Sequence, residues 1–560
     1  MYKQVGLCAL CIGIGIGCMP YAGLAADSVE QAQQQAEARL LAEHLQADSQ
    51  APSVRLQQTL AGDVRSDELP HETTAFRIHH INVEAEASFF CTYKQAIQHY
   101  EGRRIGPKGI NRIARKLQEA IVADGYVTTD VVVPEQDISK GTLVIKVIPG
   151  RIEDIRFTRP VAWGTWRNAF PTSTGDILNL RDLEQGLEQM KRVANQDVSM
   201  NIVPGNKAHT SVVELTRTES APITVGISVD NAGYKETGQW ESSVSTAWYN
   251  PLGLNDVLTY TYGKDIEHND ASLGSDNYYV SYSIPYGRYT MSASAYRNHF
   301  KQTIATVQPY LSSGVTKGQR IGVERLLRRD GTSKTSLRAQ VMRRERHNFI
   351  NDEEIEIQQQ KATALEFGIA HRRYAGRTQA DIYAFFRKGV GGWGAERAPW
   401  EDGEWYGTPR YSLWGLQMTL QAPLRIGMTE GRYRLQLVGQ YARMRLQTAD
   451  QLSIGGRYTV RGFDGERTLS GEYGAYLQQD ISFPFHDGRW EPYIGLDVGY
   501  VGGPSTEYEL GHALVGAVLG VRGRLNTHIS YDVNIGAPLY KPSGFTTGKT
   551  TVGMALYAQL

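Results

Sequence analysis

An arginine and an aspartate in the last third of the chain stand out because each charge lies among apolar residues and glycines. The stretch GGRYTVRGFDGERTLSGEYGA, residues 455–475, is glycine-rich and places Arg461 between apolar neighbours. The segment WEPYIGLDVGYV, residues 490–501, has a strand-like pattern in which Asp497 is the isolated charge. A guanidinium and a carboxylate can form a bidentate, directional pair, which is chemistry for fixing a chain in place rather than for catalysis.

Other residue types that could support catalysis lack the spacing that catalysis needs. The 13 histidines include His79 and His80 in a strand-like segment and His44 in a helical one, without an HExxH motif or metal-ligand spacing. No G-x-S-x-G motif occurs, and the paired Glu353 and Glu354 lie in a polar segment typical of solvated charge. We therefore expect no enzymatic activity, no cofactor and no metal.

Composition and the first residues narrow the class of protein. The 560 residues carry 59 basic and 59 acidic side chains, so a nucleic-acid partner is not favoured. The sequence contains no run of 18 apolar residues, so we expect no membrane-spanning helix. A transmembrane β-barrel would escape a hydropathy scan. Residues 1–26 are typical of a secretory signal peptide, with cleavage near Ala25 or Ala26. Lipidation at Cys18 is the alternative, although Gly15 is not the usual residue three positions before it.

Four regions follow the predicted signal. Residues 27–46 are rich in helix formers and polar nearly all round, which favours a helix in water or in a wet cavity. Residues 47–75 are typical of a linker. Residues 76–149 and 150–217 each combine strands with helical periodicity, and we expect two small α+β modules. Cys91, the one cysteine of the mature chain, is expected to be a small buried hydrophobe.

From residue 222 to residue 560 the pattern is that of an antiparallel barrel. We expect 16 strands, starting near residues 222, 239, 256, 277, 289, 313, 333, 359, 377, 411, 433, 474, 490, 512, 527 and 550. Tyr286–Gly287–Arg288 predicts a tight turn, whereas residues 391–410 and 445–473 predict long loops. The last strand alternates apolar and polar side chains, as expected between lipid and a wet lumen. A soluble sandwich or propeller is the alternative, but no blade repeat is visible.

The order of short motifs along the whole mature chain resembles the TpsB transporters of two-partner secretion. Residues of the first module that match the first polypeptide-transport-associated (POTRA) domain of that family include Pro134, Gln136, Asp137 and Gly141. In the second module the matching residues include Leu178 to Gly186, Pro204 and Gly205. The inward-loop motif of the superfamily is matched by Val460, Arg461, Gly462 and Phe463. The chain ends in Leu560, where such barrels often end in Phe.

The resemblance implies a partner for the arginine. In the family the loop arginine folds inward and pairs with an aspartate in a Gly-x-Asp strand motif, which is matched here by Gly495, Leu496 and Asp497. By parity, Asp497 would face the lumen if Leu496 faces lipid. The alternative is that Asp497 faces lumen water and Arg461 is solvated.

The resemblance also implies a fold and a function. The fold would be a 16-stranded outer-membrane barrel with two N-terminal POTRA domains and an N-terminal plug helix, in a Gram-negative bacterium. The protein, expected to be a monomer, would bind a large partner exoprotein (adhesin, haemolysin or contact-dependent toxin) and export it unfolded without nucleotide hydrolysis. A barrel-assembly insertase and a passive channel are the alternatives.

Three basic runs would line the lumen or meet lipopolysaccharide phosphates outside, namely Arg328–Asp330, Arg343–His347 and His371–Arg373.

Overall fold

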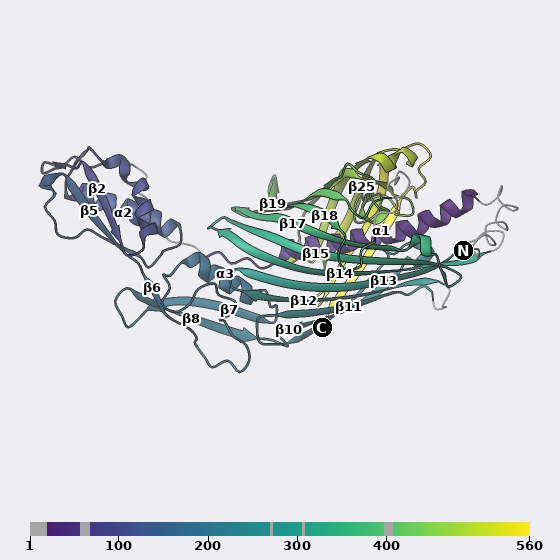
Figure 1. Cartoon of the computed structure of the whole chain (residues 1–560), viewed down its shortest axis with the longest axis horizontal. Helices are drawn as coiled ribbons and strands as arrows, with labels where there is room; N and C mark the ends of the chain where they lie inside the picture. The colour runs from purple at the N-terminus through teal and green to yellow at the C-terminus, as the bar shows by residue number, and fades with distance from the viewer. Residues whose placement is uncertain (1–18, 57–67, 269–272, 305–308, 397–406) are drawn as a thin grey trace, which may run out of the picture.

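The computed structural model describes residues 19–56, 68–268, 273–304, 309–396 and 407–560. Most of them form a long barrel, with two small modules in front of one mouth and a helix inside (Figure 1). The structure does not describe residues 1–18, so the greater part of the predicted signal peptide lies outside the described residues.

Sixteen long strands pair antiparallel with their neighbours, and the barrel closes where β27 pairs with β9. The observed first residues of the strands lie close to the expected ones. The largest difference is at β20, which was expected from residue 433 and begins at Thr429 because it directly follows a tight turn. A further two-residue strand, β16 (Glu353–Glu354), pairs with the end of β15. The sixteen strands are β9 (Ile223–Asp230), β10 (Glu241–Tyr249), β11 (Val257–Asp265), β12 (Gly274–Tyr286), β13 (Tyr289–Ile304), β14 (Tyr310–Arg329), β15 (Ser333–Ile350), β17 (Gln360–Ala375), β18 (Thr378–Val390), β19 (Ser412–Ile426), β20 (Thr429–Tyr441), β23 (Tyr473–Ser482), β24 (Glu491–Gly502), β25 (Ala513–Arg524), β26 (Ile529–Tyr540) and β27 (Thr551–Gln559).

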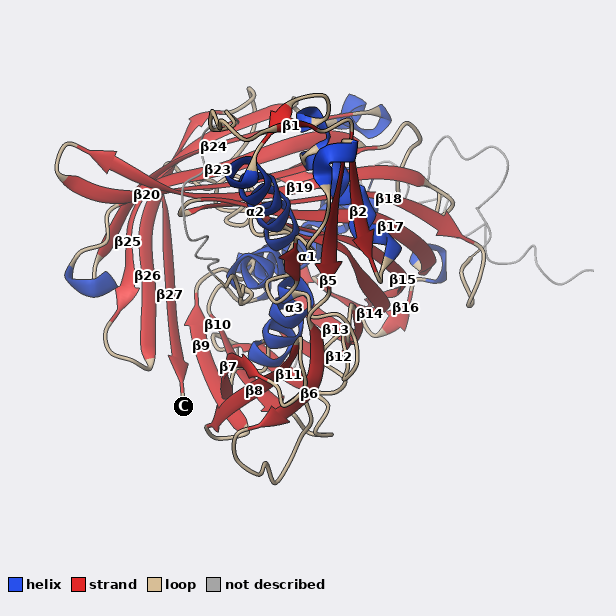
Figure 2. Ribbon diagram, turned by 90° about the vertical axis from the view of Figure 1, so that its left-hand side faces the viewer, coloured by secondary structure: helices blue, strands red, loops and turns tan. Residues whose placement is uncertain are grey.

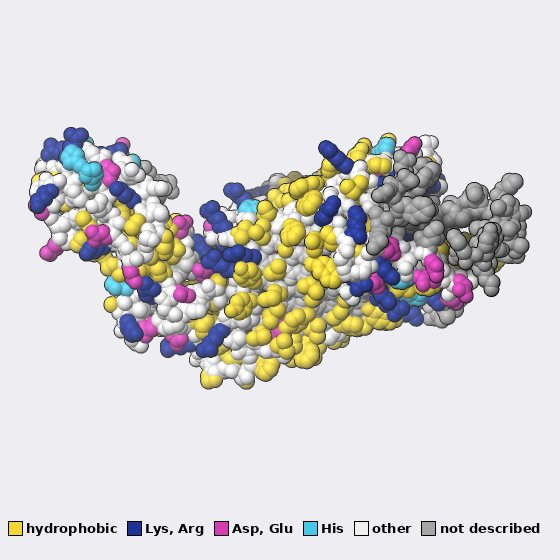
Figure 3. Space-filling model, in the orientation of Figure 1, with side chains coloured by type: hydrophobic (Ala, Val, Ile, Leu, Met, Phe, Trp, Pro, Cys, Tyr) yellow, Lys and Arg dark blue, Asp and Glu magenta, His cyan; other side chains and the backbone are white. Residues whose placement is uncertain are grey.

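Alternation along the strands gives the barrel an apolar outside and a polar inside. In β24 the side chains of Ile494, Leu496 and Val498 are exposed on the outer face, whereas Asp497 between them is buried inside. Side chains of successive strand residues point to opposite faces, so one strand serves both surfaces. The outer apolar side chains merge into a broad band over the strands (Figure 3).

The first module has a three-stranded sheet in the order β2-β5-β4, formed by β2 (His80–Ala85), β5 (Thr142–Ile148) and β4 (Asp130–Val132). Helix α2 (Pro107–Ala123) buries its apolar stripe, Ile113, Leu117 and Ile121, against the sheet. A small two-stranded sheet joins β1 (Phe76–Arg77) to β3 (Arg104–Ile105).

The prediction for Cys91 was wrong, because its side chain is exposed. Its segment forms the 3-10 helix η1 (Ser88–Ala96) rather than an α-helix. With three residues per turn, Phe90 and Tyr93 share one side of η1. Phe90 lies in the core and Cys91, the next residue, points away from it.

The second module has a sheet in the order β6-β8-β7, formed by β6 (Arg151–Phe157), β8 (Thr210–Glu219) and β7 (Gln196–Pro204). Helix α3 (Leu180–Lys191) covers it, and Asn179 caps the helix by accepting a hydrogen bond from the Arg181 amide at 2.8 Å. Strand β8 ends at Glu219 and the first barrel strand begins at Ile223, so this module adjoins the mouth.

Helix α1 (Met19–Gln50) lies within the ring of strands (Figure 2). It is longer than the helix expected over residues 27–46, since it begins within the predicted signal peptide and continues into the predicted linker. Val54, also in that linker, is buried in the core of the second module. Among the described residues, no helix is long and apolar enough to cross a membrane.

Candidate functional site

The segment between β20 and β23, residues 442–472, folds back into the barrel and is called the inward loop here. Its two short strands, β21 (Leu452–Ile454) and β22 (Leu469–Gly471), pair antiparallel. The loop has its own apolar contacts, because Val460 and Phe463 are buried in a cluster with Ile454 and with Val501 of β24. The glycine-rich stretch is therefore a packed element rather than a surface loop.

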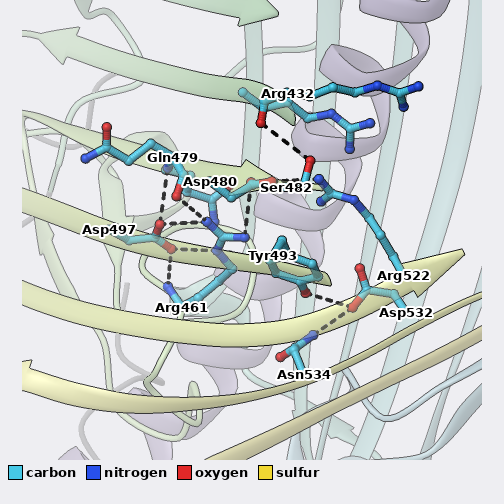
Figure 4. A network of polar contacts seen from close by, with 12 residues as sticks. Arg432, Arg461, Gln479, Asp480, Ser482, Tyr493, Asp497, Arg522, Asp532 and Asn534 are labelled. Atoms are coloured by element: carbon cyan, nitrogen blue, oxygen red, sulfur yellow. Dashed lines mark hydrogen bonds and ion pairs between the residues drawn. The ribbon is translucent and has the colours of Figure 1, made fainter. Parts of the chain in front are cut away.

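Arg461 and Asp497 are in contact, and we call this pair the lumenal anchor (Figure 4). The Arg461 Nε donates to Asp497 Oδ2 at 2.8 Å and its Nη2 donates to Oδ1 at 2.8 Å. The backbone amide of Arg461 also donates to Oδ2, at 2.9 Å. The Asp497 side chain is 1% exposed, so the carboxylate depends on these donors.

Glycines let the loop backbone approach the barrel wall. A Cβ at Gly495 would lie 2.8 Å from the Arg461 Nη2, and one at Gly516 would lie 1.9 Å from the Arg461 carbonyl oxygen. Gly462 has φ of +100°, which favours glycine, and a Cβ there would lie 2.6 Å from the Ala537 carbonyl oxygen. The sequence analysis did not single out Gly516. A glycine at a lumen-facing position of a strand could have indicated that another backbone approaches the wall there.

A wider polar network surrounds the lumenal anchor, and sequence reasoning did not find it. Asp480 lies 3.6 Å from the Arg461 Nη1 and accepts a hydrogen bond from Arg522 at 2.7 Å. Arg522 also donates to Glu491 at 3.1 Å. Figure 4 shows these side chains converging from neighbouring strands. The anchor thus belongs to a continuous ionic patch on the inner wall.

Helix α1 contacts both the wall and the inward loop. Arg39 forms ion pairs with Asp230 at 2.9 Å and with Glu241 at 2.5 Å. The amide oxygen of Gln34 accepts hydrogen bonds from Thr468 at 3.2 Å and from Ser470 at 3.1 Å. The helix is therefore fixed to the inward loop at β22 by hydrogen bonds and to the wall by ion pairs.

A second ionic cluster, the junction cluster, lies where α3 meets the barrel mouth. It consists of Glu184 and Glu188 on α3 and Arg329 and Lys334 on β14 and β15. Glu188 lies 2.8 Å from both Arg329 and Lys334. Burial alone would raise the pKa of Glu188, but Lys334 and Arg329 outweigh it and hold the pKa below its usual value.

The junction cluster also fixes the chain that follows α1. The amide of Val54 donates to Glu188 at 3.3 Å and the amide of Leu56 donates to Glu184 at 2.8 Å. Arg329 donates to the carbonyl of Val54. These contacts join a barrel strand, a module helix and the linker at one point, so residues 54–56 are not a free tether.

The motif residues of the two modules are turn-forming residues. Gln136 exchanges two hydrogen bonds with Val144, both of 2.7 Å, and Asp137 accepts one from the Ser139 amide at 2.9 Å. Pro134 accepts a hydrogen bond from Gln136, and Gly141 ends the following turn with φ of +79°. Pro204 ends β7, and the Gly205 amide donates to Thr210 at 2.9 Å. They shape the modules, and the structure does not bring them together as one surface.

Among the residues with a described position, no group of three or more His, Cys, Asp or Glu could hold a metal ion.

Comparison with known proteins identifies the family. Residues 209–523 match the haemolysin secretion/activation protein family ShlB/FhaC/HecB, residues 76–150 match the ShlB-type POTRA domain, and residues 151–204 match a further POTRA domain. The chain is 39% identical to outer membrane transporter CdiB-2 of Burkholderia pseudomallei, covering 94% of this chain and 93% of that protein. It is 27% identical to the haemolysin transporter ShlB of Serratia marcescens, covering 80% and 79%.

Solved structures agree with this result. CdiB from Acinetobacter baumannii aligns with a TM-score of 0.85 at 26% identity, and CdiB from Escherichia coli with 0.84 at 25% identity. In both cases the alignment covers 95% of this chain and 99% of the other. The predicted fold, 16 antiparallel strands preceded by two POTRA domains and a helix, is confirmed. The chain belongs to the ShlB/FhaC/HecB family, the TpsB outer-membrane transporters of two-partner secretion, with its POTRA domains in the periplasm.

Proposed function

We propose that this transporter recognises its partner exoprotein through the POTRA domains and exports it unfolded through the barrel, without nucleotide hydrolysis. The cargo is a large TpsA-type protein: an adhesin, a haemolysin or a contact-dependent toxin. The observation that carries the proposal is that the lumen is filled by α1 and the inward loop, which reach the wall by non-covalent contacts. A passive channel needs no such removable filling, and an insertase needs no passage through the lumen.

The sheet edge of the second POTRA domain is the recognition site that we propose. Strand β7 pairs with β8 along one edge, and no described strand pairs with its other edge. An extended segment can add to such an edge because its amides and carbonyls match the unpaired backbone groups. The side chains of Asp197, Ser199 and Asn201 are exposed along this strand and would flank an added segment.

Side chains cap both sheet edges of the first POTRA domain. On β2, the amide of Ile81 donates to Glu101 at 2.8 Å, and this hydrogen bond lowers the pKa of Glu101. On β4, Gln118 accepts from the Val131 amide at 2.9 Å and donates to the Thr129 carbonyl at 2.6 Å. These capped edges favour β7 as the strand that receives the cargo.

The position of β7 suits delivery to the lumen. Its first residue, Gln196, donates to Asn255 at 3.0 Å, next to the start of β11. A segment added along β7 would therefore run from the far end of the domain toward the barrel mouth.

In this proposal α1 is a plug and the lumenal anchor holds the inward loop in place. Export of a chain requires the plug to leave, since helix and cargo would occupy the same lumen. Helix α1 is held by ion pairs to the wall, by hydrogen bonds to the inward loop and by Leu45, which packs in the apolar cluster of that loop, and all of these contacts must open when the plug leaves. The anchor is buried and bidentate, so the loop stays while the plug moves.

Cross-linking tests the recognition step. Ser199→Cys in a chain that also carries Cys91→Ser would form a disulfide with a single cysteine in the secretion domain of the partner. Val132→Cys on the capped edge β4 is the matched control, because Val132 is also exposed on a short edge strand. Cross-linking at residue 199 and little at residue 132 is expected. Equal cross-linking at both positions, or none at residue 199, would exclude β7 as the site.

A further inference from the structure

A row of cations faces outward on one side of the barrel. These side chains point away from the lumen and therefore from the path of the cargo. Five consecutive strands contribute to it, and we call it the outer cation row. On β13 and β14, the exposed Arg297 and Lys317 alternate with inward-facing residues such as the buried Phe300 and Thr316. The members are Arg297, Lys317, Arg343, Lys361 and Lys388.

The row lies toward the cell-surface end of the strands. The tight turn at Gly287 contacts the second POTRA domain, where its amide donates to the Asn168 carbonyl at 2.7 Å, so this end is periplasmic. From Tyr289 at that end to Arg297, the outward positions of β13 are Met291, Ala293 and Ala295. Eight residues of a tilted strand rise about 20 Å along the membrane normal, close to the height of the apolar band of such barrels. Arg297 thus lies at the level of the outer-leaflet headgroups.

Direct neighbours in the row carry the same charge. Arg297 and Lys317 are opposite each other in the register of β13 and β14. Like charges directly opposite each other in a sheet are destabilising unless an anion lies between them. Within the described part of the chain, neither residue has an ion pair with a carboxylate.

Two acids near the row, Glu345 and Asp276, are already engaged, and a third, Glu396, interacts electrostatically with Lys361. Glu345, which is opposite both Lys317 and Lys361, pairs with Arg343. Asp276 pairs with His299 at 2.7 Å. The row therefore keeps a surplus of positive charge.

Among the described residues, two strands on the other side of the barrel, β24 and β27, contribute no cation to such a row. The outward positions of β24 and β27 at the corresponding level are apolar, as in Val498 and Tyr500 of β24 and Val552 and Met554 of β27. If the cations only extended their charged ends into the headgroup layer, they would be expected all round the barrel. Cations gathered on five consecutive strands indicate a localised ligand.

We propose that the outer cation row binds the phosphorylated headgroup of lipopolysaccharide in the outer leaflet. The row is at headgroup depth, its charge is complementary to the two phosphates of lipid A, and its side chains point into the membrane rather than into the lumen. Of the basic run at residues 343–347, the outward Arg343 belongs to this site. The next residue, Arg344, pairs with Asp450 at 2.8 Å inside the barrel. The proposal does not depend on the identity of the cargo or on the recognition step.

Lipid binding to the purified full-length protein in detergent tests this site. The probes are bisphosphorylated lipid A, lipid A without phosphates, phosphatidylglycerol and inorganic phosphate, with bound lipid counted by native mass spectrometry. The double variant Arg297→Gln/Lys317→Gln should weaken binding of bisphosphorylated lipid A by about tenfold or more, since each cation near a charged lipid surface contributes on the order of 1 kcal/mol.

The matched control is Arg325→Gln/Arg373→Gln, two exposed cations at the periplasmic ends of β14 and β17. This variant should bind lipid A as the unmodified protein does. Heat resistance of the barrel in dodecyl sulfate verifies that both variants are folded. Unchanged lipid A binding by Arg297→Gln/Lys317→Gln would overturn the proposal. Equal loss in the control, equal binding of phosphatidylglycerol or phosphate-free lipid A, or competition by inorganic phosphate at millimolar concentration would also do so.

Discussion

The lumenal anchor and the junction cluster are both ionic and largely buried, but they are built in opposite ways. The anchor centres on one carboxylate, Asp497, whose three shortest hydrogen bonds, of 2.8 to 2.9 Å, all come from Arg461, with a longer one of 3.3 Å from the Gln479 amide. In the junction cluster the charges share partners, since Arg329 contacts Glu184 and Glu188, and Glu188 also contacts Lys334. The anchor suits a permanent fixture, whereas shared partners suit a contact that can be exchanged stepwise.

The largest expected effect comes from removing the carboxylate of the anchor. Asp497→Ala leaves the Arg461 guanidinium without its main partner, and breaking such a buried pair costs about 3–5 kcal/mol. We expect loss of partner secretion and a lower temperature of barrel unfolding in dodecyl sulfate. Glu430→Ala is the control, because Glu430 lies in an exposed pair with Arg377. Secretion and heat resistance like those of the unmodified protein in Asp497→Ala would show that the anchor has no role.

Adding a methyl group at Gly516 tests the same contact from the opposite side. The Cβ would collide with the Arg461 carbonyl oxygen, which belongs to the backbone and cannot rotate away. Overpacking of this kind costs about 1–3 kcal/mol. Gly516→Ala should lower the unfolding temperature and reduce secretion, but less than Asp497→Ala.

The control for this prediction is Gly439→Ala. A Cβ at Gly439 would have its nearest neighbours at 3.6 and 3.7 Å, which is ordinary contact. If the two alanine variants behave alike, the close approach of the loop to the wall is not what holds it.

Removing the plug should change conduction rather than stability. Deleting residues 28–46 removes Arg39 and its ion pairs with Asp230 and Glu241, and it opens the lumen. We expect a higher single-channel conductance in planar bilayers, with Arg39→Ala giving more frequent openings of the same size. Unchanged conductance after the deletion would exclude α1 as the plug.

The smallest expected effect is that of Glu188→Gln in the junction cluster. Glutamine keeps a hydrogen-bond acceptor at this position and Arg329 keeps Glu184, so the free energy of unfolding should fall by only about 1 kcal/mol. More frequent channel openings are expected, because Arg329 and Lys334 lose the charge that holds them to α3. Glu214→Gln, in the exposed pair with Arg156, is the control and should change neither property.

Acid should imitate the change at Glu188. Because the pKa of Glu188 is held below its usual value, its stabilising contribution is present above the ordinary glutamate pKa of about 4.3 and is lost as the pH falls through the lowered value. Channel openings of the unmodified protein should therefore become more frequent below about pH 4, and Glu188→Gln should show a smaller acid response. Identical pH profiles would argue against a role for this carboxylate.

The sequence predicted the barrel well because strand alternation is a local property. The tight turn at Tyr286–Arg288 and the lumen-facing parity of Asp497 follow from residues that are neighbours in the chain. The pairing of Arg461 with Asp497 came from the family resemblance, since composition alone also allowed two solvated charges.

Contacts between distant segments were not predictable in the same way. Arg329 and Val54 are separated by 275 positions, and nothing in either segment indicates the other. The assignment of residues 47–75 to a linker did not foresee that α1 continues to Gln50 or that Val54 is buried in the second POTRA domain. Cys91 was misplaced because it directly follows Phe90 in the 3-10 helix η1, and only Phe90 of the two points into the core.

The central claim is that Arg461 and Asp497 act as one unit that holds the inward loop. A double-mutant cycle with Arg461→Ala, Asp497→Ala and the combined variant measures their coupling directly, from the free energy of barrel unfolding in urea. We predict that the combined variant is hardly less stable than either single one, with a coupling of about 2 kcal/mol or more. Additive effects of the two substitutions would contradict the account, because they would mean that the two residues act independently.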